Sequence, residues 1–175
     1  MHWLILLCFV LPLRAVVSAA QELRLESVGT RLGFYPDGAN GHFYEVDAAA
    51  NWNLPWSWEL GSSWRLQSRV DLSVGWLGQS SANAALGSAG PTLIGFLKTF
   101  PLSVEAGVSP TIISRSNFPS KDFGDLFQFT SHVGFSFDVA PKVRVGYRFQ
   151  HMSNAGLSRH NPGLNLHMLG VSYLF

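Results

Sequence analysis

Apolar and polar residues alternate strictly along one stretch near the end of the chain, from Val143 to Ser153. Successive side chains of a β-strand point to opposite faces, so this pattern predicts a strand with one apolar and one polar face. The apolar face ends in His151 and Ser153, whereas the polar face carries Arg144 and Arg148. The rest of the chain has to decide which of the two faces is buried.

The same alternation recurs along the chain in segments of about ten residues, the pattern of half-buried strands. Regular segments lie around 42–53, 65–76, 102–112, 127–138 and 165–175. Two other segments are less regular: Leu23 to Tyr35 changes face near Ser27, as a β-bulge would make it do, and Ala85 to Lys98 contains Pro91. With the stretch from Val143, these segments predict eight strands.

Residues 1–20 have the composition of a secretory signal peptide, with an apolar core and small residues before Gln21. Their amino-terminal region is weakly charged, and an uncleaved anchor is the alternative, although the apolar run is short for a membrane span. The one cysteine, Cys8, lies in this leader, so the mature chain has no thiol for catalysis or a disulfide. We therefore expect residues 21–175 to form a single exported domain.

The leader also contains one of the 12 basic residues, Arg14, which leaves equal numbers of basic and acidic residues in the mature chain. This neutrality argues against nucleic acid as a partner. Charged residues make up only 13% of the chain, yet the mature part lacks the long apolar run of a membrane helix. An exported chain of this kind is typical of an all-β protein, an eight-stranded antiparallel transmembrane up-and-down β-barrel in the outer membrane of a Gram-negative bacterium.

In such a barrel the apolar faces point outward to lipid and the polar faces point into a lumen that side chains fill. The lumen would then hold basic and acidic residues that pair with one another: Arg65, Arg69, Arg144, Arg148, Glu45, Asp47, Asp71, Glu105 and Asp138. We expect tight connections near 100–101 and 140–141 and longer ones at 36–41, 77–85, 114–126 and 154–163. Residues 54–63 would form one long connection at the other end, within a cluster of tryptophans that favours a membrane interface.

His151 and Ser153 would lie on the outer wall of this barrel, at the end of a strand. The following loop returns the chain so that Asn165 falls opposite His151, which brings together a nucleophile, a general base and a group to orient the imidazole. A serine two residues from a histidine also occurs by chance, and a histidine at a strand end can be a simple interfacial residue. A metal site at His151, His160 and His167 would lack a carboxylate ligand. Glu105 is the obvious acidic candidate for a catalytic triad, but its position in the alternation points it into the lumen, where it would pair with an arginine.

The motif from His151 to Leu157, His-Met-Ser-Asn-Ala-Gly-Leu, followed by Asn161-Pro-Gly163, resembles the signature of the lipid A 3-O-deacylases of the PagL type. Residues 104–107, Val-Glu-Ala-Gly, also resemble the fifth strand of that family. The resemblance implies an eight-stranded barrel with a Ser–His–acid triad on its outer wall. It also implies the roles of single residues: Ser153 as nucleophile, His151 as base, Gly156 and Asn161 as the oxyanion hole, and Asn154 beside it.

One position departs from the family pattern, because Asn165 stands where a glutamate is expected. An amide can orient a histidine but cannot stabilise its cation by charge. The resemblance implies a serine esterase that removes an ester-linked acyl chain, at the 3 position, from the lipid A of lipopolysaccharide without a metal or cofactor. A non-catalytic structural or adhesive barrel with a degenerate site is the alternative, and acyl transfer to another lipid is a third reading. The sequence leaves open which acyl chain is removed and whether a homodimer forms.

Overall fold

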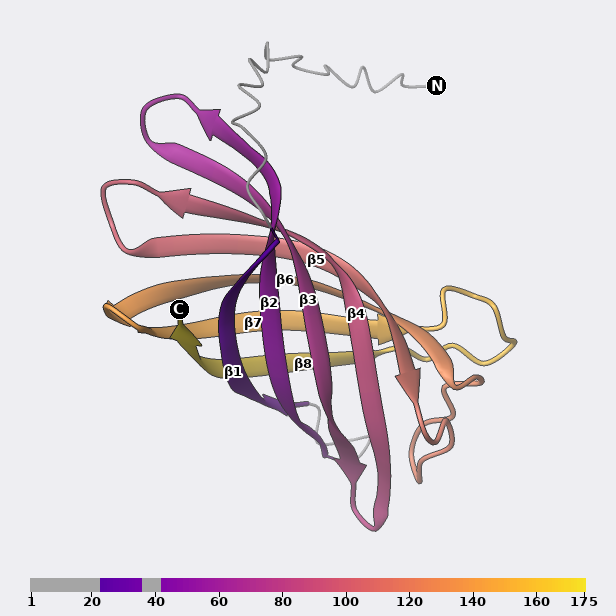
Figure 1. The fold of residues 1–175 in the computed structure, drawn as a ribbon. Coiled ribbons are helices and arrows are strands. Elements are labelled where there is room, and N and C mark those ends of the chain that lie inside the picture. Colours follow the sequence, from indigo (N-terminus) through magenta and orange to yellow (C-terminus); the bar gives the residue numbers. More distant parts are fainter. Residues whose placement is uncertain (1–22, 36–41) are drawn as a thin grey trace, which may run out of the picture.

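The structure, a computed structural model, describes residues 23–35 and 42–175 and consists of eight antiparallel strands (Figure 1). The strands are β1 (Arg24–Phe34), β2 (Phe43–Leu60), β3 (Trp64–Gln79), β4 (Ala82–Leu97), β5 (Leu102–Ile113), β6 (Phe127–Ala140), β7 (Val143–Ser153) and β8 (Leu164–Leu174). The predicted leader, residues 1–20, and the predicted connection 36–41 lie outside the described residues. Among the residues described, no helix is long and apolar enough to cross a membrane.

Each strand pairs with its neighbours in chain order, and β1 pairs with β8 to close the barrel. This closing ladder runs from Ser27 opposite Leu174 to Phe34 opposite His167. Closure satisfies the backbone groups of the first and last strands, which hydrocarbon could not do. The predicted fold class, an eight-stranded antiparallel up-and-down barrel, is confirmed.

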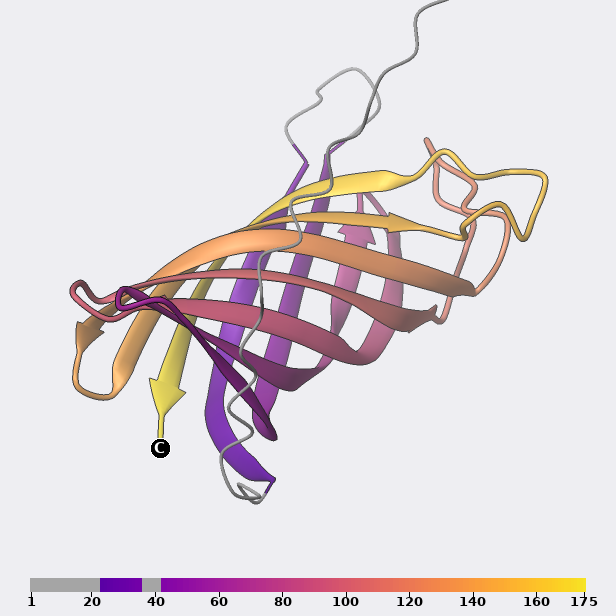
Figure 2. The same cartoon turned by 90° about the horizontal axis from the view of Figure 1, so that it is seen from above.

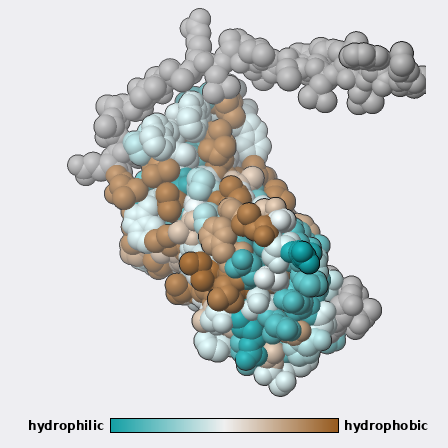
Figure 3. Space-filling model, turned by 90° about the vertical axis from the view of Figure 1, so that its right-hand side faces the viewer, coloured by the Kyte–Doolittle hydropathy of each residue, from teal (hydrophilic) through white to brown (hydrophobic). Residues whose placement is uncertain are grey.

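The barrel has its apolar residues on the outside. Val74 is 67% exposed, while Asp71 on the opposite face of the same strand is 4% exposed. Figure 3, which views the molecule from the side of the 114–126 and 154–163 loops, shows apolar side chains gathered in one broad area and hydrophilic ones in another. This inverted arrangement is the one expected of a barrel whose outer wall meets lipid.

The two ends of the barrel differ. At the turn end, β1 begins, β8 ends, and the turns 61–63, 98–101 and 141–142 join the strands (Figure 1). At the loop end lie residues 80–81 and the loops 114–126 and 154–163. Tight connections near 100–101 and 140–141 and long ones at 114–126 and 154–163 agree with the sequence analysis.

Two predicted connections are wrong. Residues 54–60 continue β2 instead of forming a loop, so the β2–β3 hairpin is long and its turn is short. Alternation failed there because the pairing shifts between Asn53 and Ser57, around Pro55. At the loop end, the expected connection 77–85 is a turn of two residues, with Ser80 at a φ of 53°.

The two segments with less regular alternation form β1 and β4, and the cause of the irregularity differs between them. In β1, the pairing with β2 shifts between Leu25 and Ser27, so the predicted bulge is confirmed and turns Glu26 toward the interior. In β4, Pro91 pairs in register with Val70 of β3. The ladder to β5 is interrupted on the other side, over the stretch that contains Pro91 and Pro110, since proline has no N–H to donate.

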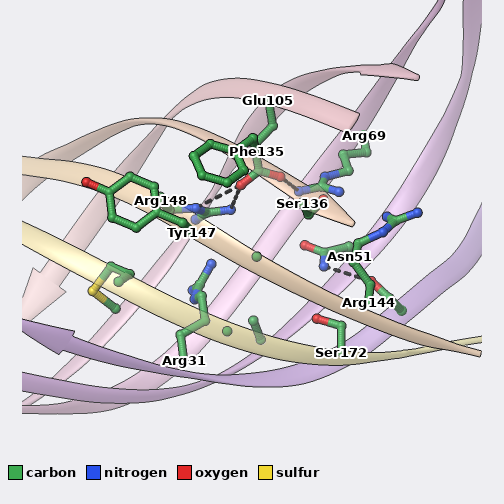
Figure 4. Close-up of a pocket in the computed structure, with 15 residues that line it drawn as sticks. Arg31, Asn51, Arg69, Glu105, Phe135, Ser136, Arg144, Tyr147, Arg148 and Ser172 are labelled. Carbon is green, nitrogen blue, oxygen red and sulfur yellow. Dashed lines mark hydrogen bonds and ion pairs between the residues drawn. The ribbon is translucent and has the colours of Figure 1, made fainter. Parts of the chain in front are cut away.

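The half of the lumen nearer the turn end holds a network of ion pairs. Glu105 lies between Arg69 and Arg148, with N–O distances of 2.5 and 2.7 Å (Figure 4). Asp71 joins both arginines, at 2.8 Å from Arg69 and 3.1 Å from Arg148. Pairing and burial of opposite charges in this way is what allows them to leave water. Glu105 is therefore a lumen residue, as predicted.

Further pairs extend this network along the wall. Arg144 contacts Asp138 at 2.6 Å and Glu26 at 2.7 Å, and Arg31 contacts Asp47 at 2.8 Å. The prediction that Arg65 belongs to the network is wrong. Arg65 is exposed in the long β2–β3 hairpin, with its guanidinium 5.1 Å from the centre of the Phe96 ring.

At the loop end the interior is apolar, which the sequence analysis did not predict. Phe118 and Phe123, both from the 114–126 loop, pack against Phe43 of β2 with ring centroids 5.3 and 6.0 Å away. The buried cluster around them comprises Leu77, Ala82, Ala84, Leu86, Ile113, Met152, Leu164, Leu166 and Met168. The 114–126 loop therefore folds inward and fills the mouth of the barrel.

We predict that Arg148→Met destabilises the barrel by about 3–5 kcal/mol, because it leaves Glu105 and Asp71 buried with one arginine fewer. Urea unfolding of the refolded protein in lipid vesicles measures the change. Arg115→Met, which removes an exposed arginine from a loop, is the control and should leave the free energy of unfolding within about 0.5 kcal/mol of the parent. A cost for Arg148→Met no larger than that of the control would show that the network contributes little.

Candidate active site

His151 and Ser153 lie in the last three residues of β7, at the loop end of the barrel, and face outward. The register of the sheet sets their neighbours: Asn165 of β8 and Ser131 of β6 both lie opposite His151. Residues directly opposite in antiparallel strands have Cβ atoms about 5 Å apart, close enough for side chains to touch. The predicted pairing of His151 with Asn165 is confirmed.

The side chains of this pair are joined by a hydrogen bond. His151 Nδ1 lies 2.7 Å from Asn165 Oδ1. An amide oxygen can only accept, so Nδ1 is the donor, and in the neutral imidazole this arrangement leaves Nε2 without a proton. A neutral histidine in this tautomer has its basic nitrogen free to take a proton from a nucleophile.

Ser153 is half-buried, and its Oγ makes no hydrogen bond within the described part of the chain. It lies two residues from His151 on the same face of β7, with Phe129 of β6 opposite. Hydrogen bonds between a nucleophile and its base are often long before substrate binds. A second serine, Ser131, is exposed beside His151 on the neighbouring strand, so geometry offers two hydroxyls to one imidazole.

A tight turn follows Ser153. Leu157 N donates to Asn154 O over 3.0 Å, and the two central residues, Ala155 and Gly156, have φ values of 54° and 81°. Positive φ at both positions is the pattern of a type I′ turn. The conformation costs Ala155 about 1 kcal/mol, which the rest of the loop must offset.

Asn154 supplies much of that support. Its side chain is fully buried, with Nδ2 donating to Phe123 O and His160 O and Oδ1 accepting from Gly156 N. Asn154 therefore fastens the loop to the barrel mouth rather than facing a substrate. Because Gly156 N–H donates to Asn154 in this conformation, that N–H is occupied by the turn itself.

Asn161 reaches the same turn from the far side of the loop. Its Oδ1 accepts from the backbone N–H of Asn154 at 3.1 Å, which orients the amide. The side chain is exposed, and its Nδ2 makes no hydrogen bond within the residues that the structure describes. Asn161 therefore presents a free N–H group near the residue that follows Ser153.

Gly163 is a residue that the sequence analysis named only as part of the motif. It has a φ of 63°, and a Cβ placed on it would lie 2.8 Å from His151 Cε1. The backbone of the loop thus packs directly on the imidazole, and only a glycine leaves room for the ring. The signal in the sequence was the Pro162-Gly163 pair, which indicated a turn but no contact with the histidine.

His167 lies two residues beyond Asn165 on the outer wall. Its Nδ1 is 2.6 Å from the Tyr147 hydroxyl, and its ring stacks on Phe34 with centroids 5.6 Å apart. It is therefore engaged with aromatic neighbours on the outer wall. Toward the turn end from this cluster, an apolar groove runs along the outer wall and is lined by Leu32, Phe135, Phe137, Tyr147, Leu169 and Val171.

Several known proteins resemble this chain. The family model described as lipid A 3-O-deacylase (PagL) matches residues 44–174. The lipid A deacylase PagL of Bordetella bronchiseptica (strain ATCC BAA-588 / NCTC 13252 / RB50) is 42% identical over 72 residues, which cover 41% of this chain and 40% of that protein. The matched region thus spans about two fifths of the curated relative's length.

Two solved structures show the same fold. The crystal structure of the outer membrane enzyme PagL superposes with a TM-score of 0.70 at 23% identity, over 83% of this chain and 97% of that one. A de novo designed transmembrane β-barrel gives a TM-score of 0.51 at 14% identity, over 90% of this chain and 100% of the design. The family model covers most of β2 and all six strands that follow, with the His151 to Gly163 motif inside the match. The chain belongs to the lipid A 3-O-deacylase (PagL) family.

Proposed function

We propose that this protein is a serine esterase of the outer membrane that hydrolyses an ester-linked acyl chain, at the 3 position, of lipid A. The observation that carries the proposal is the hydrogen bond between His151 Nδ1 and Asn165 Oδ1 on the lipid-facing wall, two residues from Ser153. The family match supports the reaction and the substrate class. A histidine held in its basic tautomer on a surface that meets lipid is suited to an ester that stays in the leaflet.

In the first half of the reaction, Ser153 Oγ attacks the ester carbonyl carbon while His151 Nε2 takes the hydroxyl proton. The bond to the sugar oxygen then breaks, and the imidazolium returns the proton to that oxygen. In the second half, His151 takes a proton from a water molecule, which attacks the acyl-serine. The bond between the acyl carbon and Ser153 Oγ then breaks, the imidazolium returns the proton to Oγ, and the free fatty acid leaves. Asn165 keeps the ring oriented through both steps without accepting a proton.

The negative charge on the carbonyl oxygen needs donors that point at it in the transition state. Asn161 Nδ2 is our first candidate, because the amide is oriented by Asn154 N–H and its own N–H is free. Gly156 N–H is the second, and it can serve when the turn releases it from Asn154 Oδ1. The acyl chain itself would lie on the outer wall, where the apolar groove beside Tyr147 and Leu169 offers matching surface.

Mass spectrometry of lipid A after incubation with the refolded protein in detergent tests the function and the nucleophile. We expect the parent to remove one hydroxyacyl chain, and Ser153→Ala to lower kcat by at least about 10³-fold. Ser131→Ala is the discriminating variant, since Ser131 is the other hydroxyl beside His151. Ser63→Ala, at an exposed turn at the opposite end of the barrel, is the control for a serine-to-alanine change outside the site and should keep the activity of the parent.

Each outcome has a distinct meaning. Loss of activity in Ser131→Ala with activity kept in Ser153→Ala would reassign the nucleophile. A parent that leaves several kinds of lipid A unchanged would indicate a barrel that keeps the motif without the reaction. Appearance of the acyl chain on another lipid, instead of as free acid, would identify an acyltransferase.

Asn165→Glu should raise kcat with KM unchanged, because a carboxylate stabilises the imidazolium by charge and an amide cannot. Asn165→Ala should lower kcat by about tenfold to a hundredfold, since the ring then loses its hydrogen bond and its orientation. Initial rates of acyl release give both values. A lower kcat in Asn165→Glu, with the barrel folded, would show that the site is adapted to the amide.

Gly163→Ala should lower kcat by about 100-fold, because the new methyl group would displace the His151 ring. The matched control is Gly61→Ala, at a φ of 64° in the β2–β3 turn, where a Cβ would meet nothing within 4 Å. Both variants carry the same backbone cost, but only one touches the histidine. Equal rates in the two variants would refute the contact between Gly163 and the catalytic ring.

A further inference from the structure

The 114–126 loop is a small folded unit and not a loose connection. Phe118 N donates to Lys121 O and Phe123 N donates to Ser116 O, which makes a short hairpin around Pro119 and Ser120. Ser120 is tied to the side chain of Gln79 at the end of β3 by hydrogen bonds through both its N–H and its hydroxyl. With Phe118 and Phe123 buried against Phe43, the loop is anchored in the barrel mouth.

This anchored loop lies beside the 154–163 loop, which carries the motif of the site (Figure 2). Two hydrogen bonds join them: Asn154 Nδ2 donates to Phe123 O at 2.8 Å, and Lys121 Nζ donates to Gly163 O at 2.9 Å. The approach is close, because a Cβ on Gly124 would lie 2.4 Å from His160 O. The two loops therefore behave as one layer packed over the end of the barrel.

The hydrogen bond from Lys121 is accepted by Gly163, the residue that packs on the His151 ring. Gly163 contacts the His151 ring on one side, and Asn165 holds Nδ1 from β8. A shift of the Gly163 backbone toward or away from the ring would change the space in which the imidazole sits. We propose that Lys121 is a positioning residue that fixes Gly163 against His151 and so sets the orientation of the catalytic imidazole.

The surroundings of Lys121 suit this role. The side chain is half-buried, and its ammonium lies 5.2 Å from the centre of the Tyr35 ring, so the charge is held by an aromatic face while it donates to the carbonyl. A charged donor makes a stronger hydrogen bond than a neutral one. The lysine thus couples a well-anchored loop to a loop that contains three described residues of positive φ, Ala155, Gly156 and Gly163.

The inference rests on the proposed function for its effect on rate, but the position of the ring can be measured without turnover. The test compares the parent with Lys121→Met, which keeps the apolar stem, and Lys121→Arg, which keeps a donor. The matched control is Lys142→Met, because Lys142 also lies 5.2 Å from an aromatic ring, that of Tyr173, but at the turn end. Two-dimensional NMR of histidine Cε1–H groups in detergent reports on the His151 ring, assigned by its loss in His151→Gln.

We expect the His151 signal to shift or double in Lys121→Met and to stay in place in Lys121→Arg and Lys142→Met. In lipid A hydrolysis, kcat per folded barrel should fall by about tenfold or more in Lys121→Met with KM unchanged, and Lys121→Arg should recover most of it. An unmoved His151 signal in Lys121→Met would overturn the inference, whatever the rate. If the parent hydrolyses nothing, the proposed function fails and the NMR signal alone decides whether Lys121 positions the ring.

Discussion

The structure depends on one constraint: hydrocarbon offers no hydrogen-bond partner to a backbone N–H or C=O, so these groups have to pair within the protein. The pairing of β1 with β8 meets that constraint by closing the sheet, and the remaining features follow from closure. A closed wall in lipid must carry apolar side chains outward, which leaves the lumen for Arg69, Asp71, Glu105 and Arg148. Their mutual pairing fills the interior, so the reaction on lipid A that we propose is placed on the outer wall and not in the lumen.

The outer wall provides rigid positions and the loops provide adjustable ones. His151 and Asn165 face each other across an unbroken ladder between β7 and β8, so their separation is set by the sheet itself. The oxyanion donors that we propose come from the 154–163 loop, whose position the sheet does not set, so the loop has to be held by other contacts. Buried Asn154, the contact of Gly163 with the imidazole, and the bond from Lys121 supply that support.

The sequence predicted what depends on period and parity, including the eight strands, the outward apolar faces, the bulge near Ser27 and the pairing of His151 with Asn165. The sequence-based prediction failed where another feature of the chain obscures the alternation of apolar and polar residues. Pro55 and the shifted pairing beside it made the end of β2 look like a loop, and the same hairpin places Arg65 outside the lumen network. The link from Lys121 to Gly163 joins residues 42 positions apart in two loops, and no local pattern in one sequence encodes it.

The interruption of the β4–β5 ladder, where Pro91 and Pro110 lie, has a mechanical meaning. A closed barrel distributes deformation around its circumference, and a part with fewer cross-strand hydrogen bonds deforms more easily. Here that part is the interrupted stretch between β4 and β5, a seam in the wall. When lateral pressure in the bilayer changes, the wall would therefore flex along this seam. The seam lies between β4 and β5, and β6 separates it from β7, so flexing there would leave intact the β7–β8 ladder that holds His151 opposite Asn165.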